Sequence, residues 1–175
     1  LYNIPLVFAL PETVHLSELE QAFTEMIRRH EILRTTFPSF EGEPVQVIGS
    51  PVDFHFEEHF IPDSETADER QITAFLRQPF NLERGPLLRG AIFRSATQKT
   101  IVAVSVHHIV FDGWSSGVLF RELAQIYRAL HQPQSPGLPE LPIQYADYAV
   151  WQRNWFQGAV FESELAFWKN QLAGI

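Results

Sequence analysis

The chain has 175 residues, 45% of them hydrophobic and 19% charged, which is enough apolar material for one domain with a buried core and excludes a disordered chain. Its formal net charge of -8 argues against a nucleic-acid-binding protein, which needs a basic face, and the absence of cysteine excludes disulfides and thiolate metal sites. No apolar run approaches the roughly 20 residues that span a bilayer, so we expect a cytoplasmic protein with neither nucleic acid nor membrane as a partner.

Strand-like and helix-like hydrophobic periods alternate along the chain. In chain order they predict a strand at 3–10, a helix at 16–30, strands at 32–37, 44–49 and 52–58, a helix at 66–77, strands from 87 and at 99–108, and helices at 115–130, 144–156 and 160–173. Ser17 and Glu20 have the spacing of a capping box at the start of the first helix. Residues 132–142 are rich in proline and predict a loop. This order predicts an α/β or α+β fold, a two-layer sandwich of a mixed sheet with packed helices.

Two adjacent histidines, His107 and His108, end the valine-rich strand that we expect at 99–108. Because side chains alternate faces along a strand, the two rings diverge, and His108 shares its face with the alternate valines. If that row faces the interior, His108 points inward at the carboxyl end of the strand, where active sites of sheet proteins open. A histidine there can act as a general base, or it can be purely structural. The diverging rings have no third ligand nearby, so we expect no metal site.

Residues 113–117, Gly-Trp-Ser-Ser-Gly, spell the G-x-S-x-G of a serine nucleophile. That motif needs an acidic residue and then a histidine downstream of the serine. His131 is the one histidine after Ser115, and it lies at the far end of the same expected helix. A helix that rises about 1.5 Å per residue cannot return that ring to Ser115. We therefore interpret Ser115 and Ser116 as N-terminal capping residues of the helix.

Four segments of the chain resemble one protein family. HHIVFDG at 107–113 matches the H-H-x-x-x-D-G signature of the condensation domains of non-ribosomal peptide synthetases. RHEILRTTF at 29–37 resembles their R-H-E-x-L-R-T-x-F segment, and YADYAVWQR at 145–153 resembles their Y-x-D-Y/F-A-V-W segment. PFNLERGPLLR at 79–89 is also similar to the family. The segments follow the family's order and cover most of the chain.

The resemblance implies a chloramphenicol-acetyltransferase-like fold, in which two halves meet in a V with a tunnel between them. Residues 1–175 would be the N-terminal half, because the family's opening S-x-A-Q-x-R motif does not precede Leu1 and its later motifs do not follow Ile175. The chain also starts without methionine. We therefore expect a fragment that is inactive by itself.

The resemblance further implies peptide bond formation in non-ribosomal peptide synthesis. The α-amine of an acceptor aminoacyl thioester attacks a donor acyl thioester, and both substrates arrive on the 4′-phosphopantetheine arms of peptidyl carrier proteins. The implied partners are the donor and acceptor carrier proteins, an adjacent adenylation domain and the C-terminal half of the domain. The domain itself is expected to bind no cofactor.

By the same resemblance, His108 is the residue assigned to the chemistry, either as a base for the attacking amine or as a group that positions it. His107 has a supporting role. Asp112 matches an aspartate that forms a structural ion pair with an arginine. Arg34 is the candidate partner, and Arg29 is the reserve.

Gly113 would allow the pantetheine arm to approach the backbone closely. Trp114 and Ser115 resemble the subtype that joins two L-configured residues. Two alternatives to the condensation enzyme stay open. One is a serine hydrolase or thioesterase fragment that uses residues 113–117, and the other is a non-catalytic module that only docks carrier proteins.

Overall fold

The structure is a computed structural model that describes residues 2–61, 65–95, 100–131 and 137–174. The chain divides into two units, Leu1–Glu140 and Leu141–Ile175. Part of the expected proline-rich loop, residues 132–136, lies outside the described residues. Its remaining part, 137–142, forms neither helix nor strand.

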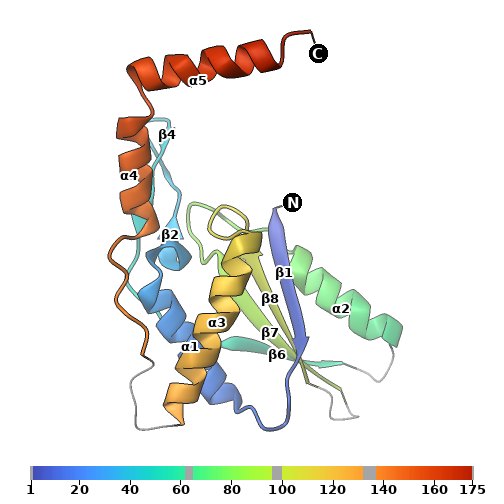
Figure 1. The fold of residues 1–175 in the computed structure, drawn as a ribbon. Coiled ribbons are helices and arrows are strands. Elements are labelled where there is room, and N and C mark those ends of the chain that lie inside the picture. Colours follow the sequence, from blue (N-terminus) through green and yellow to red (C-terminus); the bar gives the residue numbers. More distant parts are fainter. Residues whose placement is uncertain (1, 62–64, 96–99, 132–136, 175) are drawn as a thin grey trace. The chain divides into compact units, whose positions relative to one another are not determined.

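A four-stranded mixed sheet forms the centre of the first unit (Figure 1). Its strand order is β1 (Asn3–Ala9), β8 (Thr100–His107), β7 (Leu88–Ser95) and β6 (Phe56–Ile61). The first three strands are antiparallel neighbours. β6 runs parallel to β7, because the chain between them crosses over through α2 (Glu65–Arg77). The predicted mixed sheet is therefore confirmed.

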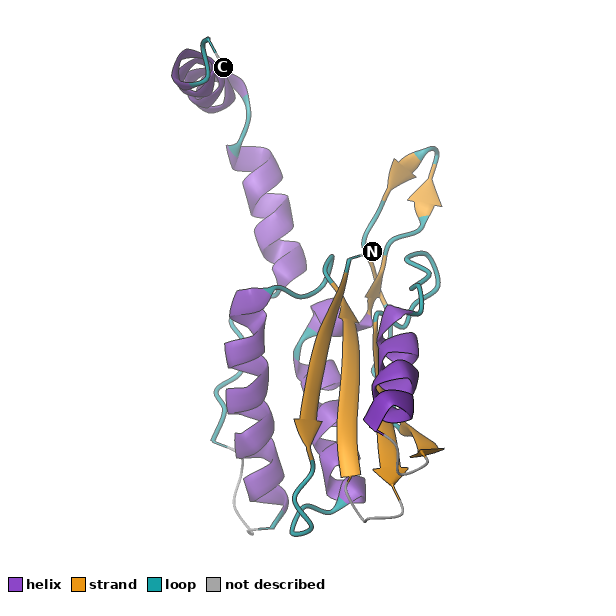
Figure 2. Ribbon diagram, turned by 90° about the vertical axis from the view of Figure 1, so that its right-hand side faces the viewer, coloured by secondary structure: helices purple, strands orange, loops and turns teal. Residues whose placement is uncertain are grey.

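Helices cover both faces of this sheet (Figures 1 and 2). α1 (Leu16–Arg29) and α3 (Gly113–Leu130) pack on one face, where the alternate valines of β8 are fully buried. α2 covers the other face, where its Phe75 packs with Ala103 of β8. The predicted α/β class is confirmed, with three layers in place of the expected two, because β8 is apolar on both faces.

Residues 31–48 form short elements in place of longer strands. They are the 3-10 helix η1 (Glu31–Arg34), β2 (Thr35–Thr36), β3 (Ser39–Phe40), β4 (Glu43–Pro44) and β5 (Val47–Ile48). The alternation at 32–37 predicted a strand, but the Thr35 hydroxyl donates to the Glu31 carbonyl at 2.8 Å and stabilises a helical turn there. Leu33 is consequently buried by the turn.

The start of α1 differs from the expected Ser17–Glu20 capping box. Its N-cap is His15, whose side chain makes no capping hydrogen bond. The carboxylate of Glu20 instead accepts the backbone N–H of Phe56 at 2.9 Å. Because Phe56 is the first residue of β6, this bond joins α1 to the start of that strand.

The second unit contains two described helices, α4 (Tyr145–Trp155) and α5 (Gly158–Gln171), which confirm the predicted pair. Trp151 and Trp155 stack along α4, with 5.6 Å between ring centroids and 9° between their planes. Among the described residues of the whole chain, no helix has the length and apolarity needed to cross a membrane.

Candidate active site

The turn between β8 and α3 carries the two histidines and the aspartate that the sequence singles out. β8 ends at His107, residues 108–110 form a turn, and α3 begins at Gly113. The N–H of Val110 donates to the His107 carbonyl at 3.1 Å. Val110 and Phe111 are each 6% exposed and belong to the core shared by α1 and α3. Their burial fixes the far end of the turn.

His107 is the last residue of β8, and both its backbone and its ring make hydrogen bonds there. Its N–H donates to the Leu87 carbonyl at 2.9 Å, and its Nδ1 accepts the N–H of Ile109 at 3.1 Å. The ring lies edge-on to Phe80, with 6.0 Å between centroids and 86° between planes. Burial, followed by the charge of His108, lowers the pKa of His107 below its ordinary 6.5. The lowered pKa favours the neutral ring, whose Nδ1 can accept the Ile109 amide, and the supporting role expected of His107 stays a prediction.

His108 lies in the turn and is exposed. Its N–H donates to the Tyr2 carbonyl at 2.7 Å, so its backbone is attached to the chain just before β1. The expectation that His108 continues the inward valine row is wrong, because the strand ends one residue earlier and alternation no longer applies. The imidazole is instead exposed, one residue beyond the end of β8.

Asp112 is the N-cap of α3. Its carboxylate accepts the Ser115 N–H at 2.8 Å and the Ser115 hydroxyl at 2.6 Å, and the Asp112 N–H donates back to that hydroxyl at 3.3 Å. These hydrogen bonds from Ser115 lower the pKa of Asp112 below its ordinary value. Next to it, a Cβ placed on Gly113 would meet nothing within 4 Å, so no described residue requires glycine there.

The two candidate arginines make other contacts. Arg34 donates to the Gly49 carbonyl and pairs with Glu31 at 3.3 Å. The carboxylate of Asp112 accepts hydrogen bonds from Ser115 instead. The structure therefore does not bring Arg34 and Asp112 together. Arg29 donates to Glu122 at 2.9 Å.

Glu122 is a buried charged residue that the sequence reasoning missed. Its carboxylate lies 2.9 Å from Arg29 Nε and 2.7 Å from His30 Nε2. Burial alone would raise the pKa of Glu122, but the hydrogen bonds and charges of His30 and Arg29 together hold it below its ordinary value. A signal was present, since Glu122 interrupts the apolar face of the helix next to Leu119 and Leu123.

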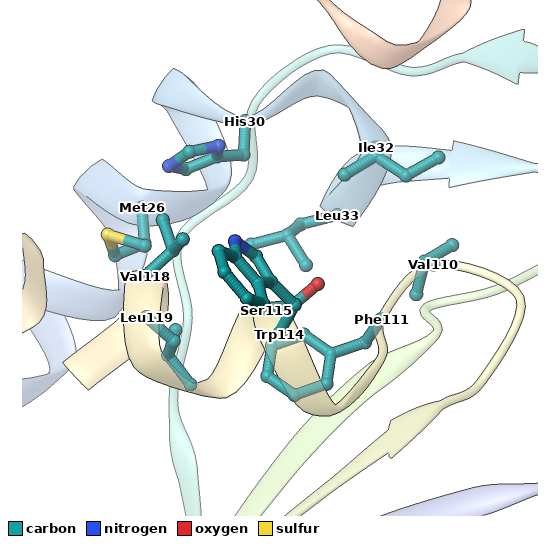
Figure 3. A pocket seen from close by; sticks show the side chains of 10 residues that line it. All are labelled: Met26, His30, Ile32, Leu33, Val110, Phe111, Trp114, Ser115, Val118 and Leu119. Carbon is teal, nitrogen blue, oxygen red and sulfur yellow. The ribbon is translucent and has the colours of Figure 1, made fainter. Parts of the chain in front are cut away.

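A small apolar pocket opens where the end of α1, η1 and the start of α3 meet (Figure 3). It encloses about 130 Å³ and is lined by Met26, His30, Ile32, Leu33, Val110, Phe111, Trp114, Ser115, Val118 and Leu119. Neither histidine of the motif is among these residues. The pocket therefore borders the far end of the turn without including the two rings.

Ser115 has the surroundings of a capping residue rather than of a nucleophile. It lies in the first turn of α3 as the reciprocal partner of Asp112, eight residues after the end of β8. His131, at the other end of α3, pairs with Glu18 at 2.8 Å. Among the described residues, no group of three or more His, Asp or Glu side chains could hold a metal ion.

Comparison with known proteins places these features in one family. The family model described as "Condensation domain" matches residues 1–175. Gramicidin S synthase 2 of Aneurinibacillus migulanus is 38% identical over 172 residues, which are 98% of this chain and 4% of that protein. Chondramide synthase cmdD of Chondromyces crocatus is 38% identical over 179 residues, which are 99% of this chain and 5% of that protein.

Solved structures agree with the sequence relatives. The crystal structure of the X-domain from teicoplanin biosynthesis superposes with a TM-score of 0.86 at 30% identity, over 99% of this chain and 39% of that chain. A complex of the X-domain with OxyB matches equally well. The chain thus spans less than half of these solved chains and a few per cent of the curated relatives. The fold, the H-H-x-x-x-D-G turn and these matches together show that the chain belongs to the condensation-domain family.

Proposed function

We propose that the domain containing this chain forms amide bonds in non-ribosomal peptide synthesis, between a donor acyl or peptidyl thioester and an acceptor aminoacyl thioester. The observation that carries the proposal is the exposed ring of His108. The turn that presents it is fixed by the hydrogen bond from the His108 N–H to the Tyr2 carbonyl and by the buried side chain of Val110. A histidine that is fixed in place and open to solvent suits proton transfer with a bound substrate.

The proposed reaction is aminolysis of a thioester. The acceptor amine attacks the donor carbonyl carbon, a C–N bond forms, and the C–S bond breaks with release of the donor thiol. The amine must lose a proton on the way to the amide, and that proton leaves with the thiol or through a base. His108 can accept it, or it can donate a hydrogen bond that orients the tetrahedral species. His107 and Asp112 act on this chemistry indirectly, by holding the two ends of the turn.

The substrates in this proposal are carried on the 4′-phosphopantetheine arms of two peptidyl carrier proteins, with an adenylation domain adjacent in the same polypeptide. The support is the match to synthetase chains that are far longer than this one. We propose that residues 1–175 are the N-terminal part of the domain and that they are inactive without the remainder. The exposed His108 side chain would face the tunnel formed with that remainder.

Substitutions in the complete domain test the proposal. The assay follows amide formation between the parent's donor and acceptor carrier proteins, each charged by its own adenylation domain. We expect His108→Ala to lower the rate by about 100-fold or more while both carriers still bind. Ser115→Ala should leave most of the activity, because Ser115 only caps α3. A suitable control is His55→Ala, since the His55 side chain is 74% exposed and far from the motif in sequence. Full activity of His108→Ala together with loss in Ser115→Ala would support a serine hydrolase instead.

One observation favours a second candidate, a non-catalytic docking module. The X-domain, 30% identical to this chain, has been solved in complex with OxyB. If the complete wild-type domain bound its charged carriers and formed no amide, the docking function would replace the catalytic one.

A further inference from the structure

The end of α2 and the residues that follow it are attached to the sheet by hydrogen bonds from side chains of two strands. Asn3 of β1 donates through Nδ2 to the carbonyls of Leu76 and Gln78, each at 2.8 Å. Arg89 of β7 donates to the Gln78 carbonyl and, at 3.3 Å, to the Pro79 carbonyl. The backbone just before Phe80 is therefore fixed relative to the sheet.

Phe80 lies between Arg89 and His107. The Arg89 guanidinium carbon is 4.0 Å from the centroid of the Phe80 ring, close enough for a cation–π contact. The same ring meets His107 edge-to-face, with 6.0 Å between centroids. Arg89 thus holds the two residues before Phe80 through their carbonyls and contacts the Phe80 ring, and that ring in turn packs against His107.

The protonation state of His107 controls the turn that follows. Its Nδ1 accepts the Ile109 N–H at 3.1 Å, which is possible only while Nδ1 carries no proton. A proton on Nδ1 would place two donors, the Nδ1–H and the Ile109 N–H, against each other and break this hydrogen bond. Because Ile109 directly follows His108, losing the bond would loosen the turn at the residue next to His108, although the bonds of His108 to Tyr2 and of Val110 to His107 would remain.

The groups around His107 oppose its protonation. His108 is next in the chain, and Arg89 lies on the neighbouring strand behind Phe80. Tyr2, in the segment before β1, contributes a ring 6.4 Å away. A positive charge on His107 would therefore lie in a partly buried site next to a second imidazole.

No nearby carboxylate favours the protonated form of His107 through a salt bridge among the described residues. Among the described residues, no carboxylate forms a salt bridge with His107 or Arg89. The charge of Glu57 raises the pKa of Arg89, but burial outweighs it and leaves that pKa lowered. Burial is also the largest cause of the lowered pKa of His107.

We propose that Arg89 and Phe80 are positioning residues for His108, acting through the neutral ring of His107. Arg89 keeps Phe80 against His107, Phe80 keeps water from that ring, and the ring keeps the Ile109 amide in the turn. The kinetic part of this inference rests on the proposed amide-forming function, but the link from Arg89 to His107 does not.

Two measurements on the complete domain test the inference. The first is the titration of His107, read from its isotope-labelled imidazole signals. We expect Phe80→Ala and Arg89→Met to raise its pKa toward the ordinary histidine value, because water then reaches the ring. The second is kcat for amide formation, which we expect to change less than about twofold at neutral pH and to fall several-fold more than in wild type as the pH drops below the ordinary histidine pKa of about 6.5. Phe80→Leu, which keeps an apolar side chain, provides a milder variant and should give a smaller effect of the same sign.

The matched controls are Phe93→Leu and Arg94→Lys. Phe93 is a fully buried ring on β7, packed with Phe75 and His59, and Arg94 is its neighbour, paired with Glu58. Neither should move the His107 titration, even where Phe93→Leu lowers the melting temperature. The inference is overturned if His107 titrates as in wild type in both the Phe80 and Arg89 variants, or if the controls shift it equally. It is also overturned if its pKa rises and kcat falls at low pH no more than in wild type. If instead the wild-type domain forms no amide, the proposed function fails, and the titration alone decides the link from Arg89 to His107.

Discussion

Arg29 and Glu122 form an ion pair in the interior of the first unit, with 2.9 Å between Arg29 Nε and the carboxylate and with side chains only 8% and 9% exposed. The pair joins the end of α1 to the middle of α3. His30 shares the same carboxylate oxygen at 2.7 Å. Because the 29–37 segment and the 107–113 turn are attached to these two helices, the pair fixes how the two motifs lie relative to each other.

Glu122→Gln should destabilise the complete domain by about 3–5 kcal/mol, because it removes the negative charge that Glu122 places against the buried Arg29. The folded-state pKa of Glu122 lies below the ordinary 4.5, so its stabilisation is present above that value and is lost as the pH falls through the folded-state pKa. Urea unfolding should therefore show a large difference between variant and wild type near neutral pH, and this difference should shrink as the pH falls below 4.5.

The control for Glu122 is Glu25→Gln. Glu25 pairs with Arg28 at 2.6 Å on the surface of α1, where the side chains are 34% and 52% exposed. Removing such a pair should cost about 0–1 kcal/mol. Equal losses for the two variants would contradict a structural role for the buried pair.

Asp112→Ala should fray the first turn of α3, because Ser115 loses the acceptor of both its N–H and its hydroxyl. Asp112→Asn keeps an acceptor oxygen and should retain most of the protection. Hydrogen exchange at the Ser115 amide in the complete domain measures the difference. The lowered pKa of Asp112 means that the cap of the wild type is at full strength above the ordinary 3.8 and weakens as the pH falls below it. If Asn proved as damaging as Ala, an ion pair of Asp112 rather than the cap would be the important contact.

Gly90→Ala should destabilise the sheet, because a Cβ there would lie 2.6 Å from the Phe56 ring and 2.8 Å from the Phe54 ring. Overpacking of this kind costs about 1–3 kcal/mol. Gly117→Ala is the matched variant and should instead stabilise the protein. Gly117 lies inside α3, and a Cβ there would meet nothing within 4 Å. Alanine in a helix interior should contribute about 0.5–1 kcal/mol over glycine. Denaturation of both variants in parallel checks the prediction, which is wrong if Gly90→Ala is neutral.

Elements with a strong local pattern could be predicted closely. The apolar spacing at 16–30 predicted α1, observed at Leu16–Arg29, and the valine row at 99–108 predicted β8, observed at Thr100–His107. In both, the hydrophobic period alone decides the conformation. The residue types of the turn between β8 and α3 were likewise evident from the motif at 107–113.

Features that depend on distant partners could not be predicted. Glu20 matched a capping box by spacing, yet it bonds to the backbone of Phe56, in a strand that only the folded sheet brings near. The orientation of His108 was wrong because the end of β8 depends on where neighbouring strands stop pairing. The pairing of Arg34 with Asp112 followed from the family resemblance, whereas the structure gives each of them a nearer local partner. The catalytic assignment of His108 stays a prediction.

The pairing of β1 with β8 has a consequence for synthesis on the ribosome. Asn3 pairs with His107, and the Tyr2 carbonyl accepts the His108 N–H. At a translation rate of about 5–20 residues per second, β1 waits on the order of 5–20 s before its partner strand has been made. During that time its apolar side chains have no sheet to join. We therefore expect β1 to join the sheet, and the His108 amide to reach the Tyr2 carbonyl, only after β8 has left the ribosome.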